Sequence, residues 1–169
     1  IAEKKLTPYY YYPVIVYLTD AELDKYQLYT SKIIQNIVKR KDKTIVTNLA
    51  KEFMLKRARL VAGASEKIEK LREMANDFKN EKNMLIYCGA TNVQGYDNCS
   101  DDDIRQIDYI SRMLNFDFGM RTAQFTSRED SKERKRRLEE FQNGEIQALI
   151  AIKCLDEGVN VPAIKTAYI

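Results

Sequence analysis

The 169-residue sequence has no histidine and no tryptophan, and only three cysteines and three prolines. The absence of histidine excludes Ser-His and Cys-His catalysis and every histidine-containing metal site. The cysteines, Cys88, Cys99 and Cys154, are scattered and odd in number, which favours reduced thiols in a cytoplasmic protein over a disulfide framework. The apolar runs are too short for a transmembrane span and the N-terminus has no signal-peptide pattern, so we expect no membrane partner.

Glycine is also scarce, and none of the six glycines lies in the phosphate-binding pattern G-x-x-x-x-G-K-[ST]. Apolar residues make up 44% and charged residues 31% of the chain, which is typical of a globular protein. The net charge of +3 permits a polyanionic partner without requiring one.

The first half of the sequence predicts a strand followed by helices. Residues 8–18 are rich in tyrosine and β-branched residues, which favours an edge strand because of Pro13. Alternatively, the tyrosines at 9–12 could stack on nucleic-acid bases. Thr19 and Glu22 have capping-box spacing and begin a helix that the cationic run 39–43 is expected to close. Further helices are predicted over 45–61 and from Ser65, the expected cap, to residue 78.

The second half alternates short apolar runs with helical segments. Strands are predicted at 84–87, 122–126, 147–152 and 166–169, with helices from about 100 to 118 and from the cap Asp130 to 141. This order predicts an α/β fold with a doubly wound parallel sheet and helices on both faces. Ligands bind such sheets beyond the carboxyl ends of the strands, where the loops 88–91, 126–127 and 153–162 should lie side by side.

Three charged stretches have a functional and a structural interpretation. The acids 101–103 could bind a divalent cation, but acids in the first turn of a helix need no metal to explain them. The run KERKRR at 132–137 could contact phosphates, although a solvated helix face is favoured. Asp156 and Glu157 after an apolar run could form a Walker B strand, but that interpretation needs the phosphate-binding loop that is absent.

The segment CLDEGVNVP at 154–162 resembles motif V of superfamily 2 helicases and translocases. MLIYCGAT at 84–91 resembles their motif IV, and QFTSRED with its following helix resembles the segment between the two motifs. Residues 83–169 are thus similar to the second, RecA-like domain of these motors, and end before the position of motif VI. Residues 1–82 resemble the strand and helical segment that link the motor domains.

The resemblance implies an ATP-dependent DNA helicase or translocase of the restriction or repair type, with DNA favoured over RNA. It implies ATP and Mg²⁺ as ligands of the intact motor, none bound tightly by this chain, and a first RecA-like domain as a partner in cis. No catalytic residue and no metal ligand is expected here, so the chain alone should be inactive. By position, the residues facing the ATP cleft and the domain interface would be Glu157, Gly158 and Asn160. Those near the nucleic-acid backbone would be Gly89, Ala90, Thr126, Ser127, Lys153 and Cys154.

Two positions depart from the family pattern. Asn160 stands where many members have a ribose-contacting aspartate, and its amide can hydrogen-bond a hydroxyl only without charge assistance. Ile152 stands where RNA helicases have a threonine. The alternative function is a stand-alone, doubly wound module that binds a nucleotide or a protein without catalysis. An upstream phosphate-binding loop and a downstream arginine-rich motif VI would distinguish the motor from the module.

Overall fold

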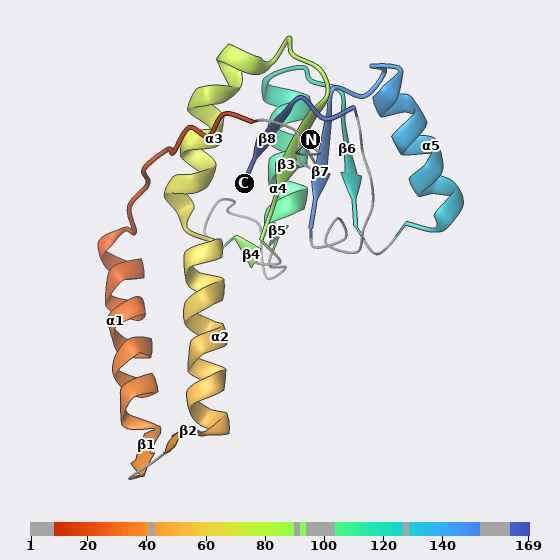
Figure 1. Ribbon diagram of the computed structural model, residues 1–169. Helices are drawn as coiled ribbons and strands as arrows, with labels where there is room; N and C mark the ends of the chain where they lie inside the picture. Colours follow the sequence, from red (N-terminus) through yellow and green to blue (C-terminus); the bar gives the residue numbers. More distant parts are fainter. Residues whose placement is uncertain (1–8, 41–42, 90–91, 94–103, 127–128, 153–162) are drawn as a thin grey trace, which may run out of the picture.

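The computed structural model describes residues 9–40, 43–89, 92–93, 104–126, 129–152 and 163–169. The described residues form eight strands and six helical segments, which are labelled in Figure 1. In chain order they are α1 (Asp20–Gln35), β1 (Ile37–Arg40), β2 (Lys43–Val46), α2 (Asn48–Ala62), α3 (Ser65–Phe78), β3 (Met84–Tyr87), β4 (Asn92–Val93), β5 (Ile104–Arg105), α4 (Gln106–Arg112), the π-helix η1 (Met113–Asp117), β6 (Thr122–Phe125), α5 (Ser131–Gln142), β7 (Ala148–Ala151) and β8 (Thr166–Tyr168).

Four of these strands form a wholly parallel sheet in the order β6-β7-β3-β8. The register aligns the strand ends, since Tyr87 of β3 and Phe125 of β6 both pair with Ala151 of β7. The two small remaining sheets are antiparallel hairpins, β1-β2 and β4-β5. The predicted parallel α/β sheet is therefore confirmed.

Alternate residues of the central strands enter two different cores. Met84 and Ile86 of β3 pack with Ile150 of β7 against α3, α4 and η1. Leu149 of β7 packs on the other face against Phe141 of α5. Because consecutive side chains of a strand point to opposite faces, both faces are covered by helices, as the doubly wound prediction requires.

The antiparallel helices α1 and α2, joined by the β1-β2 hairpin, form an arm (residues 20–62) that projects from the sheet (Figure 1). The rings of Tyr29 and Phe53 lie 6.0 Å apart between the two helices. Arg57 of α2 lies over the Tyr26 ring at 5.3 Å and donates to the Thr30 hydroxyl at 3.1 Å. Aromatic and cation–π contacts thus join the two helices in the middle of the arm.

Four local predictions are wrong. Residues 9–19 form neither strand nor helix, and the four tyrosines are 79–89% exposed. The segment crosses α3 on its way to α1 (Figure 1). The cationic run does not close α1, which ends at Gln35, because Asn36 caps it by donating to Ile33 and Lys32 carbonyls. The β-branched pairs that follow, Ile37 with Val46 and Val38 with Ile45, favour a hairpin instead.

Ser65 is not a cap: α3 has Ala64 at that position and no side-chain cap of its own. The long helix predicted from residue 100 is also shorter, since α4 begins at Gln106 and continues as a π-helix that buries Leu114 and leaves Phe116 83% exposed. The Asp130 cap is confirmed, because its carboxylate accepts from the Glu133 N–H at 2.7 Å. No described helix has the length and apolar character needed to cross a membrane.

The carboxylate of Glu22 replaces the missing cap of α3. One oxygen accepts from the Thr19 N–H at 2.9 Å and completes the predicted capping box, while the other accepts from the Ser65 N–H at 3.0 Å. Partial burial acts to raise the pKa of Glu22, but the hydrogen bonds from Ser65 and Thr19 outweigh it, and the pKa is lowered. A single side chain therefore fastens the start of α1 to the start of α3.

Replacing Glu22 by alanine should lower the free energy of unfolding by about 1–2 kcal/mol, because two helix N-terminal amides lose their acceptor. For a chain of this size that corresponds to roughly 2–8 °C in melting temperature. Since the pKa of Glu22 is lowered on folding, the difference between the two proteins should be full above the ordinary pKa of 4.5 and shrink as the pH falls below it. The control is Asp24→Ala, which removes an exposed acid of the same helix. Equal losses of unfolding free energy in the two variants would contradict the role of Glu22 in fastening α1 to α3.

Candidate functional site

The carboxyl ends of β3, β6 and β7 meet at one edge of the sheet, here called the carboxyl edge. Gly89 follows β3 and Thr126 follows β6, so the structure places these two predicted site residues at that edge. The other predicted site residues lie outside the described part of the chain: Ala90, Ser127, Lys153, Cys154, Glu157, Gly158 and Asn160. Their roles, and those of Gly89 and Thr126, stay predictions.

Gly89 lies at a close contact between the sheet and the arm. A Cβ atom at this position would be 3.0 Å from the Ala62 Cβ at the end of α2 and 3.4 Å from the Gln106 side-chain oxygen. The first distance is shorter than ordinary van der Waals contact. Glycine therefore lets the arm approach the end of β3 without a shift of Ala62.

Gln106, the first residue of α4, joins the same two parts by hydrogen bonds. Its side chain is buried, with 3% exposed. The amide oxygen accepts from the Gly89 N–H at 2.9 Å, and the amide nitrogen donates to the Ala62 carbonyl at 3.4 Å. No sequence pattern indicates this residue, because a single glutamine before an apolar helical stripe gives no signal of its long-range partners.

Cys88 precedes Gly89 but is not available for chemistry. Its side chain is 3% exposed, and burial raises the pKa of its thiol to about 12. The thiolate is the nucleophile and the metal ligand of cysteine chemistry, so a thiol that stays protonated serves neither role. This thiol is a small apolar member of the core beneath the carboxyl edge.

Thr126 is held by a carboxylate at the end of β6. Its N–H and its hydroxyl both donate to Glu129, at 2.6 and 2.9 Å. The other Glu129 oxygen accepts from Arg137 of α5 at 3.0 Å. Partial burial acts to raise the pKa of Glu129, yet the hydrogen bonds from Thr126 and the charge of Arg137 lower it. An N–H, a hydroxyl and a guanidinium thus surround an anion at this corner of the carboxyl edge.

The cations of α5 are engaged in ion pairs and in holding β6. Arg134 donates to the Thr126 carbonyl at 2.9 Å, and Arg137 donates to the Gln124 carbonyl. Arg136 pairs with Glu133 at 2.6 Å. Hydrogen bonds from Arg136 and Arg137 lower the pKa of Glu133 to about 2, so these pairs stay charged at neutral pH. The arginines of the KERKRR run therefore stabilise α5 and β6, and Lys135 is solvated.

The described residues offer few other candidate sites. A polar hollow of about 420 Å³ lies between β6 and α5, but the acids and arginines that line it are already paired with one another. No group of three or more cysteines and acids in the described ranges is placed to hold a metal ion. The acids 101–103 lie outside those ranges.

The family described as the helicase conserved C-terminal domain matches residues 66–169, which is more than half of the chain. The match begins at the second residue of α3 and includes the whole four-stranded sheet, but not the arm. A comparison with curated proteins gave no match. The predicted division of the chain between residues 82 and 83 stays a prediction, although α3 already packs into the core of the sheet.

Among solved structures, the chain is similar to the C-terminal domain of the Sulfolobus solfataricus SWI2/SNF2 ATPase, with a TM-score of 0.58 and 14% identity over 87% of this chain and 65% of that one. It also matches the Pyrococcus furiosus Hef helicase domain, with a TM-score of 0.43 and 20% identity over 84% of this chain and 28% of that one. The first likeness shows the fold, and the second is too weak to carry an argument. The chain spans less than two thirds of the length of either structure.

Gly89→Ala should lower the free energy of unfolding by about 1–3 kcal/mol, because the new methyl group meets Ala62. Ala62→Gly alone should cost about 0.5–1 kcal/mol, the usual loss for glycine in a helix. In the double variant the two changes should compensate, so that it unfolds less easily than Gly89→Ala alone. Denaturant unfolding of the four proteins measures this coupling. Strictly additive losses would contradict the contact.

Proposed function

The chain belongs to the helicase conserved C-terminal domain family, and from that membership we propose that it forms the second RecA-like half of an ATP-dependent DNA helicase or translocase. The fold and the family match also confirm the resemblance to superfamily 2 proteins that the sequence predicts. The finer statements, ATP as substrate and DNA as track, are part of the proposal.

One observation supports the proposal most strongly. The segment CLDEGVNVP at 154–162, which resembles motif V, begins three residues after the end of β7, and β7 ends at the carboxyl edge beside β3 and β6. Ligands of parallel α/β sheets bind at this edge. The segment that resembles motif V is therefore joined by the chain to the edge at which nucleotide and nucleic acid would bind.

In the proposed motor, a first RecA-like domain supplies the phosphate-binding loop and the acids that hold Mg²⁺. Glu157, Gly158 and Asn160 would face the ribose and the interface between the domains. The backbone amides and hydroxyls at the carboxyl edge would contact phosphates, which positions a strand without reading its sequence. Such contacts suit a protein that steps along any DNA. The proposal keeps the cytoplasmic location that the cysteine pattern predicts.

Thr126 shows how a phosphate could be accepted at this edge. Its N–H and hydroxyl are both donors, and Arg137 adds a positive charge 3.0 Å from the carboxylate that these donors hold. A phosphate oxygen has the same needs as that carboxylate. Binding of a phosphate to Thr126 would therefore displace Glu129, because the phosphate and the Glu129 carboxylate compete for the same two donors.

The 169-residue chain alone should show no DNA-stimulated ATP hydrolysis, because it has no phosphate-binding loop. Assembled with a first RecA-like domain, it should hydrolyse ATP in a DNA-dependent manner. Glu157→Ala should then reduce turnover tenfold or more, which is about 1.4 kcal/mol of barrier, and leave the melting temperature of the chain nearly unchanged. Steady-state turnover and melting are measured on the same preparations.

The control is Glu139→Ala, which removes an exposed acid of α5 and should leave turnover unchanged. Normal turnover per folded molecule in Glu157→Ala, together with a large loss of melting temperature, would mean that Glu157 supports the fold and would contradict the motor role of this loop. The same result would favour the stand-alone binding module.

A further inference from the structure

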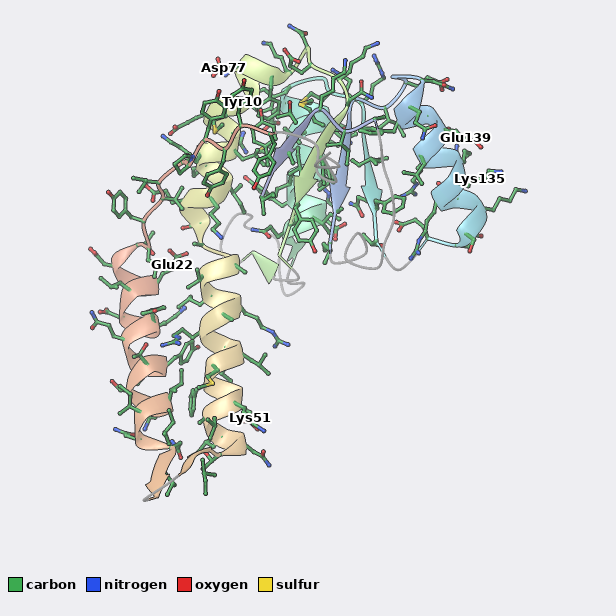
Figure 2. The ribbon with its side chains drawn as sticks, viewed as in Figure 1. Tyr10, Glu22, Lys51, Asp77, Lys135 and Glu139 are labelled. Carbon is green, nitrogen blue, oxygen red and sulfur yellow. The ribbon has the colours of Figure 1, made fainter. Side chains whose placement is uncertain are left out.

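One face of α2 points at the carboxyl edge. Ala62 lies on this face, because its Cβ makes the close approach to Gly89. Residues at intervals of three, four, seven and eleven share one side of a helix, so Ala58, Leu55 and Lys51 lie on the same side as Ala62. We call these four residues, with the adjoining Arg59, the inner face of α2. Figure 2 shows Lys51 on the side of α2 that is turned away from α1, and the arm extends from the sheet on the side of the carboxyl edge (Figure 1).

The inner face is cationic, and no ion pair among the described residues neutralises its charges. Helix α2 has four cations, Lys51, Lys56, Arg57 and Arg59, against the single acid Glu52. Arg57 is engaged with α1, whereas Lys51 and Arg59 are exposed. The ion pairs of the described residues lie in α3 and α5 and at Asp117 and Glu129, and none includes a residue of the arm.

Helix stability does not explain the position of Lys51. The first turn of α2 has no acid, and it contains this lysine. The helices α1, α3 and α5 all have acids in their first turns. A cation near a helix N-terminus opposes the macrodipole, so Lys51 weakens the helix that carries it. A residue that breaks a local rule without a local gain is a candidate for a functional role.

We propose that Lys51 and Arg59 bind the phosphate backbone of a nucleic acid that runs from the carboxyl edge of the sheet onto the inner face of α2. The proposal rests on the proposed function for the part of the path at the sheet. Eight residues of helix separate the two cations, a rise of about 12 Å. Successive phosphates of one duplex strand advance by about 3.4 Å along its axis, so the two cations would contact different phosphates three to four steps apart.

The binding of labelled duplex DNA to the chain, measured by fluorescence anisotropy without ATP at about 20–150 mM salt, tests the proposal. The test variant is Lys51→Gln with Arg59→Gln. Two lost phosphate contacts should make the plot of log affinity against log salt less steep by about 1.8, and affinity at about 50 mM salt should fall at least tenfold. The control, Lys25→Gln with Lys32→Gln, removes the same charge from exposed positions of α1. It should change the slope of log affinity against log salt by less than about 0.5.

Equal losses in the two double variants would mean that only net charge matters and would overturn the proposal. Absence of binding by the unmodified chain at the lowest salt would overturn it too. Leu55 is 58% exposed between the two cations. An unchanged salt slope in the test variant, with DNA affinity lost in Leu55→Ser, would mean that this face contacts DNA through apolar groups and would overturn the proposed phosphate contacts. Because ATP is absent, a failed ATPase test overturns the motor function and leaves this result standing.

Discussion

The side-chain amide of Gln106 joins three parts of the molecule that are far apart in the sequence. It begins α4, accepts from the Gly89 N–H at the end of β3 and donates to the Ala62 carbonyl at the end of α2. Because Gln106 is buried, each of these polar groups would lower the free energy of unfolding by about 1–3 kcal/mol if it were left without its partner. The position of the arm relative to the carboxyl edge therefore depends on this amide.

A second fastening lies at the other side of the arm's base. Glu22 of α1 binds the first amide of α3, and Glu66 of α3 accepts from the Tyr17 N–H. Since α3 packs into the core of the sheet through Ile68 and Phe78, α1 is also tied to the sheet, through α3. Ala62, at the end of the inner face of α2, lies against Gly89, so the inner face adjoins the carboxyl edge. The proposed nucleic-acid path follows from this arrangement.

The sequence predicts the parts of the fold that depend on local signals. The short apolar runs at β3, β6 and β7, the Thr19 capping box and the Asp130 cap all depend on neighbouring residues, and all are confirmed. The tyrosine segment is different, because a strand exists only where another strand pairs with it, and composition cannot show that partner. The same holds for Gln106 and Glu22, whose hydrogen bonds reach up to 44 residues along the chain.

Mapping the amides that respond to a short DNA duplex by NMR tests most directly whether the arm and the sheet edge form one binding surface. A shared binding surface predicts chemical-shift changes along the inner face of α2 and at Gly89 and Thr126, and none at the opposite edge of the sheet, at Asn83 and Gly144. Changes confined to that opposite edge, or to the carboxyl edge without α2, would contradict it.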